Sequence, residues 1–330
     1  MKNKKNTTKR IVLSTDDIIS NPFGYTFKEI SDCMGEAEAK KMFFSLYKVK
    51  NKSKYHNIGV QSVTKDGNGT QKYIFKLSDD RYIETVSIKR RSGTTVCVST
   101  MVGCPIGCVF CESGRNGFVR NLTTSEIVQQ VIMMPSNVNR IVFMGMGEPL
   151  LNYESVIKAI HILRDREGFD FPTSGITIST VGPLNQMKKL REEHVKIQLA
   201  VSLHATSQNT RNMLIPNMKN TNIEDIVKSA LSYSERHNRK ITIAYLLVAG
   251  VNDKQSDVDR LVNWFAGKNI MINILQYNPT NSSKLKRPNK QMLTEFKKKL
   301  EKGGLYVKVR ESKGVNINAA CGQLVSKYNK

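Results

Sequence analysis

The strongest constraint on the fold of this chain is a regular alternation of strand-like and helix-like segments that begins near residue 95. Short β-branched or apolar runs are each followed by a segment in which apolar residues recur at helical spacing. The expected strands cover residues 95–100, 140–144, 175–179, 197–203, 241–248, 270–277 and 305–310. Such alternation predicts parallel strands joined by crossover helices, so we expect an α/β fold built as a partial (β/α)6 barrel.

Residues 1–85 follow a different pattern, which includes polar and lysine-rich stretches. Here the run Asp66-Gly67-Asn68-Gly69 separates two strand-like segments, residues 60–63 and 73–77. A glycine-rich turn between two such segments predicts a β-hairpin. We therefore interpret residues 1–85 as a small N-terminal accessory module, with contact to RNA as one role for it, and residues 86–330 as the main domain.

The chain carries a large positive charge, because 51 Lys and Arg stand against 28 Asp and Glu, a formal net charge of +23. Such an excess attracts polyanions, so RNA or DNA is the leading class of partner. An anionic membrane surface comes second, and a general effect on solubility is the alternative. No apolar run approaches the roughly 20 residues of a membrane span. The first residues also lack the apolar region of a secretory signal, so we expect a cytoplasmic protein without membrane contact.

Three cysteines lie close together in the loop expected after the first barrel strand. Cys104, Cys108 and Cys111 have the spacing Cys-x3-Cys-x2-Cys, and no fourth cysteine is near them in the sequence. In a cytosolic chain of this length, clustered cysteines indicate metal binding or catalysis rather than a disulfide scaffold. A 4Fe–4S cluster usually takes four thiolates, so three leave one iron free to bind a small molecule. Zinc is the alternative, but structural zinc needs four closed ligands, and neither a second cysteine pair nor a histidine is close.

Other candidate residues fall where the remaining expected strands end, which is where parallel α/β folds bind their ligands. These residues are Gly147, Glu148, Ser179, Ser202, His204 and Asn278. Glycine lets the backbone approach a ligand closely, and Glu148 can accept a hydrogen bond from an ammonium group. Together with the cysteine loop, the loop that carries Gly147 and Glu148 fits a site for the methionine part of S-adenosylmethionine.

Several longer runs give the sequence a specific resemblance. They are residues 97–104, 117–123, 145–152, 201–204, 250–253, 277–279 and 318–324. In this order they resemble the RlmN/Cfr family of radical-SAM adenosine methyltransferases, which modify ribosomal RNA. The combination of Cys97, seven residues before the cluster loop, with the Ala-Ala-Cys321-Gly-Gln-Leu tail is very selective. The resemblance spans about residues 82–325 and implies that residues 86–330 form a radical-SAM catalytic domain.

The resemblance also implies a mechanism that uses two further cysteines. The family methylates C2 or C8 of an adenine, and these electrophilic carbons cannot attack the methyl group of S-adenosylmethionine directly. A first S-adenosylmethionine would methylate Cys321, and a second, cleaved at the reduced 4Fe–4S cluster, would supply a radical that removes hydrogen from this methyl group. After the resulting methylene radical adds to the adenine, Cys97 would take the ring proton and form a disulfide with Cys321 to release the product.

The same resemblance assigns cofactor and substrate contacts. The residues that would contact S-adenosylmethionine are Gly147, Glu148, Ser179, Ser202, His204 and Asn278. Glu84 would lie near the substrate adenine, with an exposed strand glutamate as the alternative. The alternative interpretation of Cys97 and of Cys321 is a buried structural thiol. The alternative interpretation of His204 is a structural histidine. Cys33 matches none of the motifs, and we interpret it as a packing residue.

The family's activity implies 23S ribosomal RNA as the partner, or transfer RNA, and an electron donor such as flavodoxin or ferredoxin. Family members usually carry a longer helical N-terminal module, and its shortness here leaves the RNA substrate open. Residues 147–149 are closer to the C2-methylating branch, whereas residues 243–253 and 277–280 are closer to the C8-methylating branch. Two alternatives stay open: an enzyme of this fold that acts on another RNA, a peptide or a small molecule, and a non-enzymatic RNA-binding protein held together by zinc.

Overall fold

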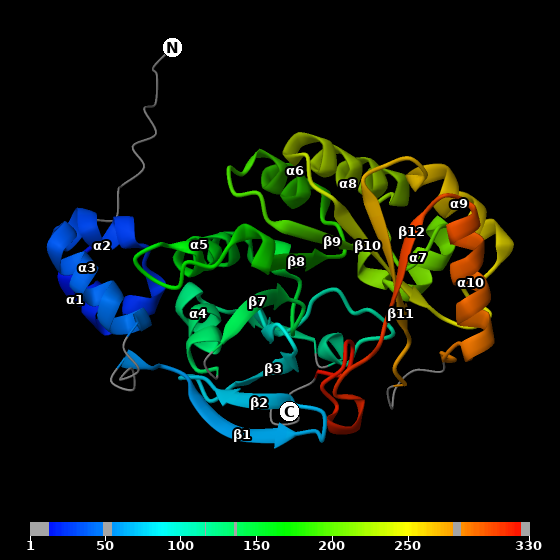
Figure 1. Ribbon diagram of the computed structural model, residues 1–330. Helices are drawn as coiled ribbons and strands as arrows, with labels where there is room; N and C mark the ends of the chain where they lie inside the picture. The colour runs from blue at the N-terminus through cyan, green and yellow to red at the C-terminus, as the bar shows by residue number, and fades with distance from the viewer. Residues whose placement is uncertain (1–12, 49–54, 116, 135–136, 280–284, 325–330) are drawn as a thin grey trace, which may run out of the picture.

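Seven parallel strands form the centre of the molecule within the part of the chain that the structure describes (Figure 1). The computed structural model describes residues 13–48, 55–115, 117–134, 137–279 and 285–324. The parallel strands, in spatial order, are β4 (Gly93–Val98), β7 (Val138–Phe143), β8 (Ile176–Thr180), β9 (Gln198–Ser202), β10 (Ile241–Leu247), β11 (Ile270–Gln276) and β12 (Tyr306–Arg310). Each one matches a strand expected from the sequence, so the predicted α/β architecture is confirmed.

Helices connect these strands and cover the outer face of the sheet (Figure 1). They are α4 (Thr124–Ile132), α5 (Tyr153–Arg164), α6 (Leu184–Glu192), α7 (Gln208–Leu214), α8 (Ile223–His237), α9 (Gln255–Phe265) and α10 (Lys290–Lys302). A local pattern is enough to fix the start of α4, because Thr123 and Glu126 cap its first turn with a reciprocal pair of hydrogen bonds, a capping box. No helix in the described residues is both long enough and apolar enough to cross a membrane.

The N-terminal part adds antiparallel strands to the same sheet. Strands β1 (Gly59–Lys65) and β2 (Thr70–Lys76) form the expected hairpin, and the Asp66 side chain accepts hydrogen bonds from the Asn68 and Thr70 N–H groups in its turn. Strand β3 (Tyr82–Arg90), which the sequence analysis did not identify, joins β2 to β4. The proposed boundary at residue 85 lies inside β3, and a separate role for residues 1–85 stays a prediction.

Three short helices precede the hairpin: α1 (Thr15–Ser20), α2 (Phe27–Met34) and α3 (Glu36–Phe43). They lie beside α5 (Figure 1), and an ion pair of 2.7 Å between Lys158 Nζ and Glu29 Oε1 links α2 to that helix. Helices of six to eight residues span too few turns for a clear apolar period, which is why the sequence did not reveal them. Residues 1–12 and 49–54 of the predicted module, and Thr280, lie outside the described residues.

The parallel sheet is strongly curved, as a partial barrel requires. The guanidinium Nη1 of Arg310, at the end of β12, lies 3.7 Å from the sulfur of Met144, which directly follows β7. These two strands stand five places apart in the sheet, so only curvature can bring their ends together. The concave face encloses a cavity of about 810 Å³, and the carboxyl ends of the strands open into it.

Candidate active site

The cysteine loop is held in place by a small hairpin at its base, formed by β5 (Met101–Gly103) and β6 (Phe118–Asn121). Gly103 has a φ of +77°, and a Cβ atom there would lie 1.9 Å from the Gly117 carbonyl oxygen, so only glycine fits. The Cys104 N–H donates to the same carbonyl at 3.1 Å, and the Cys111 N–H donates to the Cys108 carbonyl at 3.0 Å. The three thiols therefore project from a loop whose backbone is fixed at both ends.

The thiols of this loop share one electrostatic environment. Burial raises the pKa of Cys104 to about 12, and it raises the pKa of Cys108 well above its ordinary value. The charges of Cys111 and Cys104 raise the pKa of Cys108 further, because like charges nearby disfavour the thiolate. As the described side chains stand, no group of three or more Cys, His, Asp or Glu residues is arranged to hold a metal ion, and the raised pKa values of the three cysteines favour protonated thiols. Binding of an iron–sulfur cluster would therefore have to displace thiol protons.

A buried carboxylate faces the cavity on the neighbouring loop. Glu148 is 3% exposed, its Oε1 accepts from the Leu150 N–H at 2.9 Å, and its Oε2 accepts from the Val181 N–H at 2.9 Å. Burial raises the pKa of Glu148 to about 7, although these two N–H groups oppose the change. No cationic side chain of the described residues forms an ion pair with it. Glu148 is therefore oriented by the backbone and still available to a positively charged ligand.

Polar side chains at the ends of the next strands complete this side of the cavity. The hydroxyl groups of Ser179 on β8 and Ser202 on β9 lie 3.3 Å apart. Asn278, after β11, is buried, and its Oδ1 has no hydrogen-bond partner among the described residues, while its Nδ2 donates to the Cys321 carbonyl at 3.2 Å. An unsatisfied buried amide oxygen is costly, so this atom favours a ligand that donates a hydrogen bond.

His204 is held as a neutral ring. Its Nδ1 accepts from the Leu246 N–H at 3.0 Å, and its ring packs edge-on against Phe110 with a centroid separation of 5.0 Å. Burial lowers the pKa of His204 to about 3, and the charge of Arg211 lowers it further. The interpretation of His204 as a structural histidine therefore explains the hydrogen bond of Nδ1 and the packing of the ring. His204 also lines the cavity, so its contact with S-adenosylmethionine stays a prediction.

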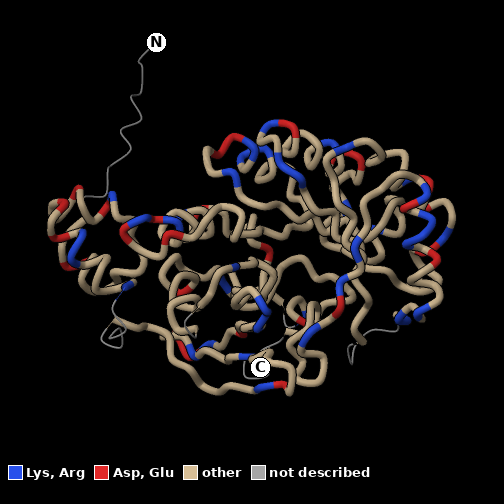
Figure 2. The backbone as a smooth tube through the Cα atoms, viewed as in Figure 1, with Lys and Arg blue, Asp and Glu red and all other residues tan. Residues whose placement is uncertain are grey.

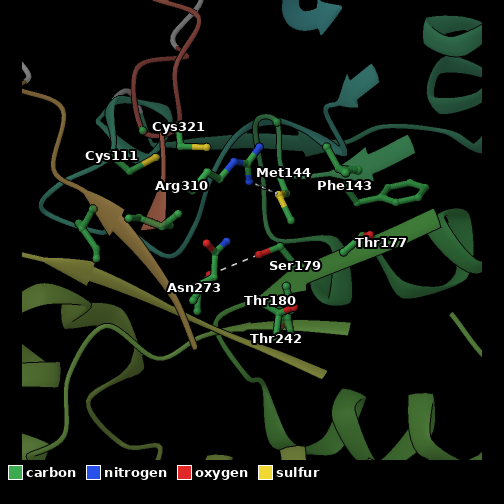
Figure 3. Close-up of a pocket in the computed structure, with 18 of the residues that line it drawn as sticks. Cys111, Phe143, Met144, Thr177, Ser179, Thr180, Thr242, Asn273, Arg310 and Cys321 are labelled. Atoms are coloured by element: carbon green, nitrogen blue, oxygen red, sulfur yellow. Dashed lines mark hydrogen bonds between the residues drawn. The ribbon is translucent and has the colours of Figure 1, made fainter. Parts of the chain in front are cut away.

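The C-terminal tail returns to the cysteine loop and carries Cys321 with it. Gly322 has a φ of +83°, and a Cβ atom there would lie 2.9 Å from the Phe110 carbonyl oxygen. The Glu112 N–H donates to the Gly322 carbonyl at 2.8 Å, and the Ser113 hydroxyl donates to the Leu324 carbonyl at 2.7 Å. These contacts place Cys321 beside Cys111, on the same side of the cavity (Figure 3).

Cys97 lies close to Cys321 at the back of the site. Cys97 is 9% exposed and lies near the end of β4; both cysteines line a small cavity of about 50 Å³ next to the main one. Burial raises the pKa of Cys97 to about 12, the charge of Cys321 adds to this, and the charge of Arg310 opposes it. The charge of Cys321 also raises the pKa of Cys111. Two cysteines from distant parts of the sequence thus meet next to the cluster loop.

Most of the residues predicted from the sequence line the main cavity. They are Cys104, Cys108, Cys111, Gly147, Glu148, Ser179, Ser202, His204, Asn278 and Cys321. Glu84 does not border it: this side chain is buried, 1% exposed, and its Oε1 lies 3.4 Å from Lys72 Nζ. Its alternative interpretation as an exposed strand residue is therefore wrong. The Cys33 sulfur donates to the Leu13 carbonyl at 3.4 Å and packs against the core, as expected for a packing residue.

Sequence reasoning missed the polar lining of the barrel and its arginines. Thr177, Thr242 and Asn273 face the cavity from the middle of their strands (Figure 3). Arg211 is buried and donates to the carbonyl oxygens of Val181, Ser202 and Leu203, which holds two strand ends together. On β8 the alternation of Thr177 and Ser179 with isoleucines was an available signal, whereas Thr242 and Asn273 are single polar residues on strands whose other cavity-facing positions are apolar. The position of Arg211 depends on how α7 packs, and no local pattern reveals it.

Comparisons with known proteins show similarity over most of the chain. Residues 98–264 match the model of the Radical SAM superfamily. A probable RNA methyltransferase of Rhodopseudomonas palustris is 45% identical over 258 residues, which cover 78% of this chain and 72% of that protein. A probable dual-specificity RNA methyltransferase RlmN of Thermotoga maritima is 41% identical, over 78% of this chain and 76% of that protein. The crystal structure of a radical SAM methyltransferase from Sphaerobacter thermophilus has a TM-score of 0.86 and 31% identity, and the match covers 92% of this chain and 98% of that one.

Proposed function

Because this chain belongs to the RlmN/Cfr family of radical-SAM RNA methyltransferases, we propose that it methylates C2 or C8 of an adenosine in 23S ribosomal RNA through a methylated Cys321. Membership of this family means that the protein is an enzyme that methylates RNA, and it excludes the alternative of a non-enzymatic RNA-binding protein held together by zinc. The observation that carries the finer proposal is the meeting of Cys321 with Cys97 and Cys111. Transfer RNA is the second substrate that the proposal includes.

The family implies a 4Fe–4S cluster and S-adenosylmethionine, and the residues of the cavity fit both groups. Three thiols on one loop suit a cluster with an open iron, and Cys104, Cys108 and Cys111 would hold it. The unpaired Glu148 carboxylate suits the ammonium of S-adenosylmethionine, and the unsatisfied Asn278 Oδ1 suits one of its hydrogen-bond donors. When bound, the two groups supply a methyl group and the radical chemistry that an electrophilic adenine carbon requires.

Cys321 is suited to carry a methyl group because its neighbours fix the backbone and leave the sulfur accessible. The Asn278 amide and the Glu112 N–H hold the carbonyls of Cys321 and Gly322, while the Cys321 side chain is exposed to the cavity. In the proposed cycle the Cys321 sulfur accepts the methyl group and then links its carbon to the adenine. Cys97 takes the ring proton while the radical adduct gives up one electron, for which the cluster would be the acceptor. The Cys97 sulfur then attacks the Cys321 sulfur, the bond from that sulfur to the transferred carbon breaks, and this carbon takes a proton to become the methyl group. The resulting disulfide needs two electrons from a thiol reductant before the next cycle.

The environment of Cys97 supports its proposed role as a base. A thiol must ionise to take a proton, and burial opposes this by raising the pKa of Cys97 to about 12. A high pKa also makes the thiolate strongly basic once it forms. The nearby positive charge of Arg310 favours the thiolate, so Arg310 would help to generate the base within the closed site.

Two further parts of the proposal concern the cellular setting. The cluster needs a one-electron donor, for which flavodoxin or ferredoxin has the required chemistry. We place the reaction in the cytoplasm, where the ribosomal RNA is available and where reducing conditions keep the functional thiols free.

The proposal is tested by anaerobic incubation of the cluster-loaded enzyme with ribosomal RNA fragments, S-adenosylmethionine and a reductant, followed by nucleoside mass spectrometry. Wild-type enzyme should yield 2-methyladenosine or 8-methyladenosine. Cys321→Ala should yield neither, because the carrier sulfur is gone, yet keep its iron content. Cys33→Ala is the matched control and should behave as wild type. Methylated adenosine from the Cys321→Ala enzyme would refute the carrier role, and its absence from wild-type reactions with an intact cluster would refute the substrate.

A further inference from the structure

Two arginines lie next to each other on the cavity side of the sheet, at its rim. Arg90 ends β3 and Arg140 belongs to β7, on either side of β4. The Arg90 Nε donates to the Thr95 hydroxyl at 3.2 Å, and Thr95 pairs directly with Arg140 in the strand register. Both arginines are exposed and line the main cavity, so an outside ligand can reach them.

A third arginine reaches the same region from the opposite edge of the sheet. Arg310 ends β12, and its side chain extends toward Met144 across the cavity (Figure 3). Arg310 and Arg90 also line the small cavity that Cys97 and Cys321 border. Arg90 and Arg310 thus lie beside the position where the target base is proposed to react, and Arg140, which lines the main cavity, is close enough to Arg90 for its charge to act on it.

The charge of this cluster is not neutralised by the protein. Within the described residues, none of the three guanidinium groups forms an ion pair with a carboxylate. Glu311 also borders the cavity, but its carboxylate lies 3.9 Å from Lys313 Nζ. Burial, together with the charges of Arg310 and Arg140, lowers the pKa of Arg90, as expected for cations that repel one another. The thioether sulfur beside Arg310 is a weak acceptor for a guanidinium donor.

Further positive charge surrounds the cluster. Lys308 on β12 and Lys313 after it line the cavity, and Figure 2 shows several basic residues and one acidic residue in this segment. An uncompensated group of cations at an accessible rim focuses the electrostatic field on anions. Arginine in particular matches the geometry of phosphate oxygens with paired donors.

We infer that Arg90, Arg140 and Arg310 together bind a backbone phosphate of the substrate RNA, adjacent to the nucleotide whose base enters between Cys97 and Cys321. One sugar separates a base from its phosphate, so a base at the two sulfurs brings its phosphate to the neighbouring rim. Phosphate contacts fix position and orientation without reading sequence, which is what a base inserted into a closed site needs. This inference rests on the proposed RNA methylation and adds the site that holds the target strand.

The test compares two double variants that remove the same charge. Arg90→Gln/Arg140→Gln alters the cluster, and Arg166→Gln/Lys298→Gln alters two exposed positions that do not line the cavity. Binding of a fluorescent 23S ribosomal RNA fragment to the full, cluster-loaded chain is measured by anisotropy at several salt concentrations. The cluster variant should weaken Kd about tenfold for each arginine removed, and its salt slope should fall by about 0.7 for each lost phosphate contact. The control variant should change the Kd and the salt slope by less than half as much as the cluster variant does.

Two further measurements keep the test decisive. Arg90→Lys/Arg140→Lys preserves charge and should recover most of the salt slope but less of the affinity, because lysine lacks the paired donors. It also replaces the glutamine variant if thermal unfolding shows that the latter is misfolded. Titration with 5′-AMP tests one base with its own phosphate: we expect weak binding that the glutamine variant weakens further, since AMP carries the same two groups without the rest of the RNA strand. Arginine-dependent AMP binding combined with unchanged RNA binding would overturn the inference.

The outcomes separate this inference from the proposed function. If the cluster variant binds RNA with the wild-type Kd and salt slope, the phosphate site is refuted, whatever the methylation assay gives. If arginine-dependent RNA binding is found but the wild-type enzyme produces no methyladenosine, the site stands and the proposed reaction fails.

Discussion

At the residue scale, Glu148 combines features that are rarely stable together. It is a fully enclosed carboxylate with two backbone donors and no cation paired with it among the described residues, and it borders the cavity after β7. Burial of an ionised carboxylate without a partner is unfavourable, so the protein raises the pKa of this group to about 7 instead. A ligand ammonium next to Glu148 would reverse this effect, because it would stabilise the carboxylate form.

This environment predicts a pH dependence for cofactor binding. Only the carboxylate form of Glu148 attracts an ammonium, and that form exists above its pKa of about 7 and disappears below it. The Kd for S-adenosylmethionine should therefore be lowest above pH 7 and rise by up to about tenfold per pH unit as the pH falls below 7. Equilibrium dialysis with cluster-loaded enzyme measures it. Glu148→Gln should bind weakly at every pH, whereas Glu154→Gln, an exposed control, should keep the wild-type profile.

At the element scale, the tail after β12 is held against the cysteine loop by backbone contacts. Gly322 is a point of close approach, because its carbonyl accepts from the Glu112 N–H and a side chain on it would meet the Phe110 carbonyl. The sulfur that is proposed to carry the methyl group belongs to the preceding residue, Cys321. Its position relative to Cys111 and Cys97 therefore depends on a glycine that can take a positive φ in a crowded place.

Gly322→Ala should displace the tail and lower the rate of RNA methylation by about a hundredfold, the usual cost of misplacing a reactive group by about 1 Å. Cluster content should stay at the wild-type level, since none of the cluster cysteines moves. Gly304→Ala is the matched control, because Gly304 has a similar φ of +82° but a Cβ added there would meet no atom within 4 Å. Single-turnover methylation assays with iron analysis provide the measurement. Equal rates for the two variants would mean that the tail tolerates the clash.

At the scale of the whole molecule, the N-terminal helices share a core with the catalytic sheet and its helices. Phe43 packs edge-on against Tyr47 with a centroid distance of 4.9 Å, and Tyr47 packs against Phe169 at 5.1 Å. Phe169 follows α5, so this aromatic chain crosses from the first helices to the barrel. Strand β3 makes a second connection, since it pairs with both β2 and β4.

We therefore expect the N-terminal helices and the barrel to unfold together. Phe43→Ala should lower the free energy of unfolding by about 3–5 kcal/mol, because Phe43 is fully buried. Phe44→Ala should lower it by no more than about 0.5 kcal/mol, because Phe44 is 60% exposed. Urea unfolding followed by circular dichroism and by Trp264 fluorescence tests this expectation. Two separate transitions, with only the first shifted by Phe43→Ala, would show instead that the N-terminal part unfolds as an independent unit.

The sequence alone determined the order of the barrel elements, and its short motifs singled out the cysteine loop and the pair Cys97 and Cys321. Those features depend on spacing within a few residues or on short motifs, which a chain displays before it folds. Cys104, Cys108 and Cys111 are of this kind, and so is the capping box at Thr123.

Only the tertiary structure decided which distant groups face one another. Glu84 is buried against Lys72, Glu148 lacks a paired cation among the described residues, and Arg310 reaches Met144 across the cavity. No local pattern carries this information, because it arises from the register of β3 against its neighbours and from the curvature of the sheet. The arginine cluster has the same origin: its members come from β3, β7 and β12, which are far apart in the chain, and folding alone gathers their charges at one rim.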